Sequence, residues 1–313
     1  MAPMAAMPAL PLVRPAMAEH GAAPARHIPG LTPARQRRVR ALFRLLSMLS
    51  PELAARCALR MFTTPRSRRI SGQDAGFLAT AATRRLPTAH GEVQIYEWPG
   101  DGPAVLVLHG WISYAGQLGE MIEGLRSHRL RVIAFDAPAH GRSGGRQADL
   151  ASFRDALAAV SRACGPAGAI LAHSFGAITA ASWLAEDAAA ARLRAAVLVG
   201  LPRDIGYLFE SFSIALGLRR EVIGRLRALF RARYGGDPED YAATVLAQRI
   251  HIPVLLVHGG ADEYIPAEHA REVALQLRDG RIQVIAGLNH SAPLRDPDTI
   301  ELMAQFISAR LQG

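Results

Sequence analysis

The feature that most constrains the fold is an alternation, from residue 86 onward, between short apolar runs and stretches with a helical pattern. Six of the runs are nearly continuous, as is typical of parallel strands covered on both faces. They span residues 104–108, 132–135, 169–172, 196–199, 254–257 and 282–285, and an earlier strand with period-two alternation spans 93–98. Most intervening segments are long enough for a crossover helix. The pattern therefore predicts an α/β fold with a mostly parallel central sheet flanked by helices.

Residues 202–248 interrupt this rhythm, because they separate two strands by far more than one crossover helix needs. Within them, Val222, Leu226 and Leu229 form an apolar stripe at helical spacing, with several arginines around it. The segment is predicted to be a small helical cap inserted over the strand ends, between two parts of the core at 84–201 and 249–313. A plain surface excursion is the alternative.

The part before the first strand is predicted to hold a helical extension. Residues 33–83 would form an N-terminal helical arm packed on the core. Ser50 and Pro51 suit an N-cap and the first position of a second helix, which would run to about Phe62. A first helix precedes it, and its apolar residues at helical spacing would face the core: Val39, Leu42, Phe43, Leu46 and Leu49.

Residues 1–32 are rich in Ala, Pro, Met and Gly and are predicted to be a disordered leader. The alternative is a signal peptide ending near residues 16–18, which the missing charged n-region and the interrupting prolines disfavour. Nowhere do 18 apolar residues follow one another without a charge, so no membrane span is predicted.

The net charge of +9 is concentrated in the N-terminal part. Residues 1–85 contain 14 Arg and 3 acidic residues, whereas the remainder contains 22 Arg and 24 acidic residues. The basic, amphipathic arm could lie on an anionic membrane surface, although packing on the core already accounts for its apolar stripe. Nucleic-acid binding is disfavoured, because the arm lacks Trp and Tyr residues for stacking.

The cysteine and glycine patterns argue against a disulfide-rich protein, a metal-binding protein and a protein with a phosphate-binding loop. Cys57 and Cys164 lie far apart, so the chain has neither a disulfide framework nor metal-ligand spacing, and a reducing cytoplasm is expected. The glycines at 144–145 do not introduce a helix as a phosphate-binding loop would. We therefore expect neither a cofactor nor a metal.

Three strand ends carry residues that suit nucleophilic catalysis. Ser174, Asp262 and His290 follow the runs at 169–172, 254–257 and 282–285. The carboxyl ends of parallel strands meet at one edge of the sheet. A serine hydroxyl needs a base to remove its proton, and the base needs an acid to orient it. His290 and Asp262 are the predicted base and acid. Asp204, which follows the run at 196–199, is a competing acid.

Attack on a carbonyl group creates an oxyanion, which needs two hydrogen-bond donors already aimed at it. The N–H of Phe175 lies in the first turn of the predicted helix after Ser174 and has no partner within that helix. The second predicted donor is the N–H of Trp111, just after the run at 104–108. If Ser174 were an ordinary helix N-cap instead, none of these groups would need to converge on it.

From about residue 84 onward, the chain resembles the α/β-hydrolase superfamily, in which a nucleophile elbow of form G-x-S-x-G precedes the acid and the histidine. The order of Ser174, Asp262 and His290 agrees with that family. Five segments carry the resemblance: HGW at 109–111, DAPAHGRS at 136–143, AHSFG at 172–176, HGGADEYIP at 258–266 and GLNHSAPLRDP at 287–297. The chain departs from the family where Ala172 opens the elbow and where Ala139 precedes His140, positions that usually hold glycine.

The other histidines at these strand ends, which are His109, His140, His173 and His258, are predicted to be hydrogen-bonded structural residues, since their spacing fits no metal motif. Asp136 is predicted to anchor the loop around His140.

The resemblance implies a cofactor-independent serine hydrolase that cleaves a carboxylic ester through an acyl-enzyme. Its partner would be a small-molecule ester, with an uncharged apolar or lipid-like acyl group favoured by the apolar cap. Thioesterase, amidase, C–C hydrolase and cofactor-free perhydrolase chemistry use the same triad and remain alternatives. A binding protein that keeps the fold without turnover is the alternative from another class.

Overall fold

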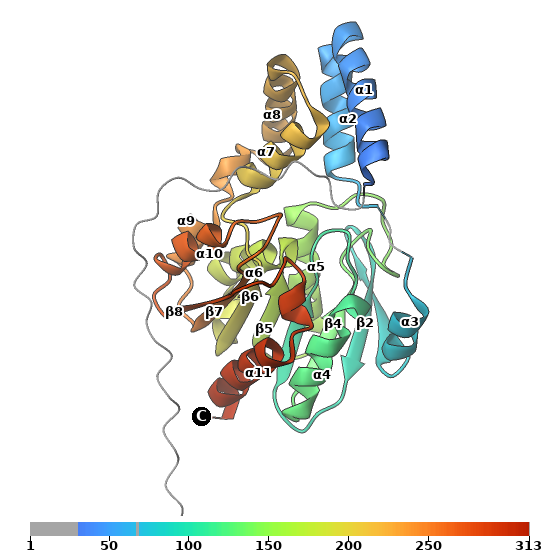
Figure 1. Ribbon diagram of the computed structural model, residues 1–313. Coiled ribbons are helices and arrows are strands. Elements are labelled where there is room, and N and C mark those ends of the chain that lie inside the picture. Colours follow the sequence, from blue (N-terminus) through green and yellow to red (C-terminus); the bar gives the residue numbers. More distant parts are fainter. Residues whose placement is uncertain (1–30, 67–68, 313) are drawn as a thin grey trace, which may run out of the picture.

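The computed structural model describes residues 31–66 and 69–312 (Figure 1). Its centre is an eight-stranded sheet with strand order β1-β2-β4-β3-β5-β6-β7-β8. The strands are β1 (Ala82–Thr88), β2 (Gly91–Trp98), β3 (Ala104–Leu108), β4 (Arg131–Phe135), β5 (Ala167–His173), β6 (Ala195–Val199), β7 (Val254–Gly259) and β8 (Gly280–Ile285). From β4 to β8 all neighbouring strands are parallel, whereas β2 is antiparallel to both β1 and β4. The predicted mostly parallel sheet is confirmed.

Helices cover both faces of the sheet, which is why its central strands are apolar throughout. α4 (Gly119–Ser127) and α11 (Pro297–Gln312) pack on one face, and α5 (Leu150–Ala163), α6 (Phe175–Glu186) and α10 (Ala267–Ala274) pack on the other (Figure 1). Along β3, Val105 and Val107 point into one apolar cluster and Leu106 and Leu108 into the other. The short helix α3 (Gly72–Leu78) precedes β1.

A group of four helices projects from one end of the sheet (Figure 1). Two come from the segment before β1, namely α1 (Pro33–Leu49) and α2 (Pro51–Phe62), and two from the segment between β6 and β7, namely α7 (Ile205–Leu216) and α8 (Arg220–Tyr234). The latter segment also contains α9 (Ala243–Ala247). The residues predicted to form a cap are therefore helical.

The N-terminal arm has its main contacts with the cap helices: α1 packs on α7, and α2 packs on α8. Gln36 donates a hydrogen bond from Nε2 to the carbonyl of Ala215 at 3.1 Å, and Arg40 donates one to the carbonyl of Ile214 at 2.9 Å. Three small buried residues of α2, Ala54, Ala55 and Ala58, allow a close helix–helix approach. The arm and the cap thus form one helical unit.

The predicted start and end of α2 are confirmed, because Ser50 accepts a hydrogen bond from the N–H of Leu53 and the helix ends at Phe62. The predicted apolar stripe on α1 is only partly correct. Phe43 is buried, but Leu42 and Leu49 are 52% and 73% exposed, because the buried face of α1 is centred on Gln36, Phe43 and Ser47. The predicted leader, and the alternative signal peptide, lie outside the described residues up to residue 30.

Candidate active site

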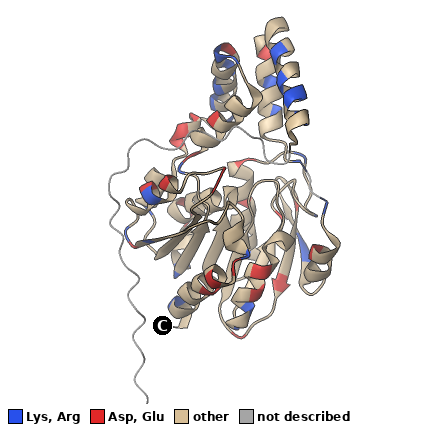
Figure 2. Cartoon of the chain, viewed as in Figure 1, with Lys and Arg blue, Asp and Glu red and all other residues tan. Residues whose placement is uncertain are grey.

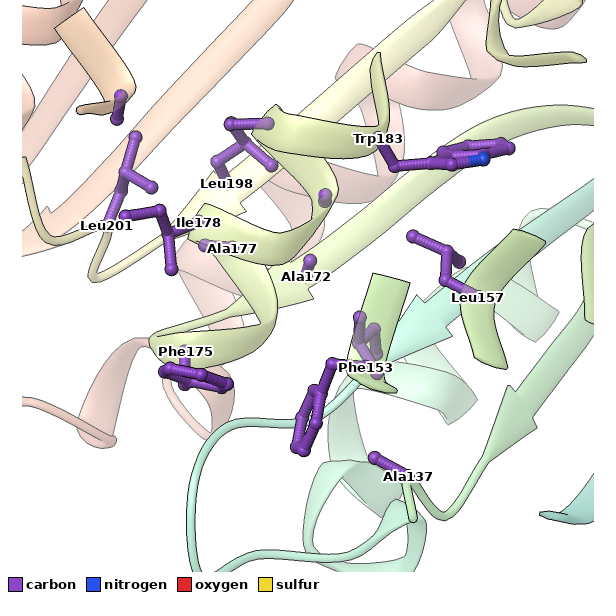
Figure 3. Packing of buried hydrophobic residues seen from close by; sticks show 14 of the residues in the cluster. Ala137, Phe153, Leu157, Ala172, Phe175, Ala177, Ile178, Trp183, Leu198 and Leu201 are labelled. Atoms are coloured by element: carbon purple, nitrogen blue, oxygen red, sulfur yellow. The ribbon is translucent and has the colours of Figure 1, made fainter. Parts of the chain in front are cut away.

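Ser174 lies at a sharp turn between the last residue of β5 and the first residue of α6. Its backbone has φ 55° and ψ −119°, a strained conformation that is uncommon for any residue other than glycine. Two glycines leave room for this turn: Gly176 in the first turn of α6 and Gly110 in the neighbouring loop after β3. A Cβ at Gly176 would lie 2.4 Å from the carbonyl oxygen of His109, and one at Gly110 would lie 2.9 Å from Cβ of Ser174. The buried cluster behind α6, shown in Figure 3, holds the turn in place.

The structure brings Ser174, Asp262 and His290 together from the ends of three strands. Nε2 of His290 lies 2.9 Å from Oγ of Ser174, and Nδ1 of His290 lies 2.6 Å from Oδ2 of Asp262. The residues are 116 and 28 positions apart, so only the parallel alignment of the strands makes this contact. A hydroxyl, an imidazole and a carboxylate thus form one continuous hydrogen-bonded chain.

The carboxylate of Asp262 has a nearly complete set of donors. Its Oδ1 accepts hydrogen bonds from the N–H groups of Tyr264 and Ile265, both at 2.9 Å, and its Oδ2 lies 3.2 Å from Nε2 of His258. Burial alone would raise the pKa of this carboxyl, but the hydrogen bonds from His258 and His290 outweigh it and hold the pKa well below its usual range. Asp262 is therefore an anion at neutral pH.

Asp204, the competing acid, is engaged elsewhere. It is the N-cap of α7, where its side chain accepts a hydrogen bond from the N–H of Tyr207, and it forms an ion pair with Arg203 at 3.1 Å. Neither of these partners belongs to the hydrogen-bonded chain of Ser174 and His290. The structure therefore places Asp262, and not Asp204, against His290.

The two predicted oxyanion donors border the same cavity as Ser174. Among the described residues, neither the N–H of Trp111 nor that of Phe175 donates a hydrogen bond to another protein group. The ring of Trp111 packs edge-on against Phe175 with centroids 5.2 Å apart, which fixes the two segments relative to one another. Both N–H groups thus remain available to a ligand beside Ser174.

The histidines at the neighbouring strand ends brace these loops. His109 accepts a hydrogen bond at Nε2 from the N–H of Ala137 and donates one from Nδ1 to the carbonyl of Gly110. His140 accepts one at Nε2 from the N–H of Ile112 and donates one from Nδ1 to the carbonyl of Pro138. Burial lowers the pKa of His109 to about 4 and that of His140 to about 3, so both are neutral at pH 7.

Asp136 also anchors its loop. The carboxylate is buried and accepts hydrogen bonds from the N–H groups of Ala115 and Arg142 and from the hydroxyl of Tyr96. Burial raises the pKa of this carboxyl. These three donors come from β2, from the segment after β3 and from the loop of Asp136 itself, so Asp136 ties the loop to its neighbours, as the sequence predicts.

Three contacts around His290 could not be predicted from the sequence. His173 lies 3.1 Å from the carbonyl oxygen of His290 through Nε2, and the two rings are 4.8 Å apart. Gly200, which follows β6 with φ 59°, leaves room for the His290 ring, since a Cβ there would lie 3.1 Å from Cε1. His258 supplies the additional donor to Asp262. In the sequence, His173, Gly200 and His258 are marked only by their position at strand ends. That position does not indicate which atom each residue contacts.

The two alanines that replace the family's usual glycines have different surroundings. Ala172 is a fully buried residue of β5 and does not have a positive φ. Ala139 has φ 62°, in the left-handed region where a Cβ is unfavourable. Only the second replacement places a side chain on a strained backbone.

A cavity of about 1190 Å³ lies beside Ser174 and His290. Its walls come from the strand-end loops, the cap and the end of α2, and apolar side chains dominate them: Met61, Phe62, Trp111, Ile205, Leu208, Phe212, Phe230 and Leu246. The arm therefore contributes to the cavity, which the sequence did not indicate.

The described residues contain neither a metal-binding cluster nor a membrane-spanning helix. In residues 31–66 and 69–312, no group of three or more His, Cys, Asp or Glu side chains is arranged to hold a metal ion. In the same residues, none of the helices is both long enough and apolar enough to span a membrane.

Comparisons with known proteins agree with this architecture. Residues 105–301 match the model of the alpha/beta hydrolase family. A non-heme chloroperoxidase of Streptomyces lividans is 26% identical over 65% of this chain and 91% of its own length, and a bifunctional esterase/perhydrolase of Acinetobacter calcoaceticus is 24% identical with the same coverage. The structure of an esterase from Pyrococcus furiosus is similar in fold, with a TM-score of 0.63 at 17% identity over 79% of this chain and 99% of that one. The chain belongs to the alpha/beta hydrolase family.

Proposed function

We propose that this protein is a serine hydrolase that cleaves carboxylic esters through an acyl-enzyme, with Ser174, His290 and Asp262 as the catalytic triad. The observation that carries the proposal is the hydrogen-bonded chain in which the His290 ring joins Oγ of Ser174, at 2.9 Å, to the carboxylate of Asp262, at 2.6 Å. These distances are within the range for direct proton transfer.

In the acylation step, Nε2 of His290 removes the hydroxyl proton as Oγ of Ser174 attacks the ester carbonyl carbon. The imidazolium then gives that proton to the alkoxide leaving group, and the ester C–O bond breaks. In the second step, His290 removes a proton from water, whose oxygen attacks the acyl carbon. The bond between that carbon and Oγ then breaks, and the imidazolium returns the proton to Oγ, which releases the acid and restores the Ser174 hydroxyl. Asp262 holds the Nδ1 proton and stabilises the imidazolium in both steps.

The tetrahedral intermediates carry a negative oxygen, for which the N–H groups of Trp111 and Phe175 are the proposed donors. Each such donor lowers the barrier by about 3 kcal/mol. Their availability in the structure and their position on the cavity that contains Ser174 support this role.

The cavity supports esters with an apolar acyl group, including lipid-like chains. Most side chains on its cap and arm walls are aliphatic or aromatic, and its volume of about 1190 Å³ exceeds what a short acyl group fills. Three arginines at its border, Arg60, Arg66 and Arg295, have no ion pair among the described residues and leave space for an anionic group on the substrate.

The test combines a fluorophosphonate probe with a chain-length series of p-nitrophenyl esters. Wild-type protein should be labelled, Ser174→Ala should not, and Ser211→Ala should be labelled, because Ser211 borders the same cavity away from the triad. The rate of p-nitrophenyl ester hydrolysis should increase as the acyl chain lengthens. An unlabelled wild-type protein would refute the nucleophile, and ester turnover by Ser174→Ala would refute the mechanism.

Transfer of the acyl group to hydrogen peroxide is the second candidate, because one similar protein is named an esterase/perhydrolase and another a chloroperoxidase. Peroxide would replace water in the second step and yield a peracid. Peracid formation from an ester and peroxide, measured alongside hydrolysis, distinguishes the two. Hydrolysis of thioesters and of amides by the same protein tests the other two substrate classes.

A further inference from the structure

Exposed apolar residues are concentrated at one place in the described structure, the junction of α1 and α2. Five of the seven large hydrophobic residues that are exposed in residues 31–66 and 69–312 lie there: Leu42, Leu45, Met48, Leu49 and Leu53, which are 48–73% exposed. Large apolar side chains gathered on one surface mark an interaction site. None of them borders the cavity beside Ser174.

The same face of α1 carries uncompensated positive charge. Arg35, Arg38, Leu42, Leu45 and Leu49 follow one another at intervals of three or four residues and so form one stripe, basic at its start and apolar at its end.

The 17-residue helix α1 contains five Arg and no acidic residue. Arg35, Arg37, Arg38 and Arg44 are exposed and form no ion pair within the described ranges. Glu52, at the start of α2, is paired with Arg56 and Arg225. Figure 2 shows the positive residues along α1.

We propose that this face of the arm docks on a bilayer containing anionic phospholipids. Leucine and methionine side chains at the α1–α2 junction would enter the headgroup–acyl boundary, and the arginines of α1 would lie over the phosphates. Figure 1 shows this junction at the outer end of the four-helix projection, away from the sheet, where a flat surface can reach it.

The positive charge of α1 favours an anionic lipid surface over two other partners for this face, a second copy of the chain and residues 1–30. A second copy of the chain would bring two acid-free α1 helices together, Arg against Arg. Residues 1–30 contain two Arg and one Glu, so they provide no complement to a basic helix. An anionic membrane satisfies both the apolar residues and the arginines.

The first test is co-sedimentation of the full-length chain with vesicles of phosphatidylcholine alone and of phosphatidylcholine mixed with phosphatidylglycerol. Binding should require phosphatidylglycerol and weaken as salt is added. The variant Arg35→Gln/Arg38→Gln should bind about 25-fold more weakly, since each basic residue near an anionic surface contributes roughly a five-fold factor. The matched control, Arg249→Gln/Arg278→Gln, removes the same charge from exposed positions elsewhere and should bind as wild type.

The second test addresses the apolar residues. Leu42→Ser/Leu45→Ser/Leu49→Ser should reduce vesicle binding by about 10-fold or more, because binding scales with the apolar area that enters the interface. Val245→Ser/Leu275→Ser, which alters the two exposed apolar residues away from the arm, should not. Hydrolysis of a short p-nitrophenyl ester shows that each variant is folded, and vesicle binding is measured independently of that hydrolysis.

Three results would overturn the proposal. The first is equal binding to both kinds of vesicle. The second is a dimer that Leu42→Ser/Leu45→Ser/Leu49→Ser dissociates, without vesicle binding by wild type, which would assign the face to a second copy. The third is vesicle binding that appears only after residues 1–30 are removed, which would assign the face to those residues.

Discussion

Gly200 provides the space that the imidazole of His290 occupies: a Cβ at Gly200 would lie 3.1 Å from Cε1 and 3.3 Å from Nδ1 of that ring. These distances are shorter than ordinary van der Waals contact, and φ at Gly200 is 59°, so an added side chain would be strained as well. The position of the proposed base thus depends on a residue that has no side chain.

We therefore expect Gly200→Ala to displace the His290 ring from its partners. A misplacement of about 1 Å costs roughly 100-fold in rate, so kcat should fall by about 10- to 100-fold with a smaller change in KM. Ester hydrolysis and urea unfolding, measured on the same preparation, separate this effect from loss of stability. Gly165→Ala, another glycine with positive φ but with open space around it, controls for backbone strain. Unchanged kcat in Gly200→Ala would show that the ring tolerates the contact.

Asp262→Asn should reduce kcat by about 10⁴-fold, because an amide cannot stabilise the imidazolium or fix the correct His290 tautomer. Asp204→Asn should retain most activity and most of the stability, because asparagine caps a helix N-terminus about as well as aspartate. The measurement is ester hydrolysis by both variants beside wild type. The reverse order of activities would transfer the acid role to Asp204.

Stability should decrease as the pH falls from 6.5 towards 4. Burial lowers the pKa of His109 to about 4 and of His140 and His173 to about 3, from 6.5. In this interval the unfolded chain binds protons that the folded chain excludes, so the free energy of unfolding decreases by roughly 1.4 kcal/mol per pH unit for each histidine.

Urea unfolding at several pH values in this interval measures that slope. His140→Gln cannot titrate, so its slope should be smaller than that of wild type by about one proton. A stability independent of pH between 6.5 and 4 would contradict the buried neutral state of these rings. The lowered pKa of Asp262 acts in a separate window, since its contribution is present above 3.8 and is lost only at lower pH.

Replacing Ala139 and Ala172 by glycine should have different effects on stability. Ala139→Gly relieves a Cβ at φ 62°, a conformation that costs about 1–2 kcal/mol for alanine, so it should be neutral or stabilising by up to about 1 kcal/mol. Ala172→Gly should destabilise by about 1–2 kcal/mol, because it removes a buried methyl group and loosens a central strand. Thermal and urea unfolding of both variants provide the comparison. Equal effects would mean that backbone conformation does not distinguish the two positions.

The parallel strands could be predicted within a few residues, because strands covered on both faces must be apolar throughout. β1 could not, since its residues ATRRLPT are mostly exposed at the sheet edge and include two arginines and a proline. Its pairing with β2 depends on backbone hydrogen bonds, which leave no apolar pattern in the sequence.

The convergence of Ser174, Asp262 and His290 could be predicted because parallel strands align their carboxyl ends. The choice between Asp262 and Asp204 required the structure, since both follow a strand and only the loop conformations decide which carboxylate reaches His290. The partner of the arm was also beyond the sequence: the periodicity of α1 indicates that one face is buried, but not that α2 and α7 bury it.

The joining of the arm to the cap also has a consequence for how the chain folds. The hydrogen bond from Gln36 to Ala215 spans 179 positions, so the four-helix unit closes a very long loop. Closing such a loop carries an entropic cost before any contact compensates it, and contacts of this separation form slowly. During synthesis the arm leaves the ribosome long before its partner helices exist. We therefore expect the wall of the cavity formed by α2 to be completed late, after the sheet from β2 to β6 has formed.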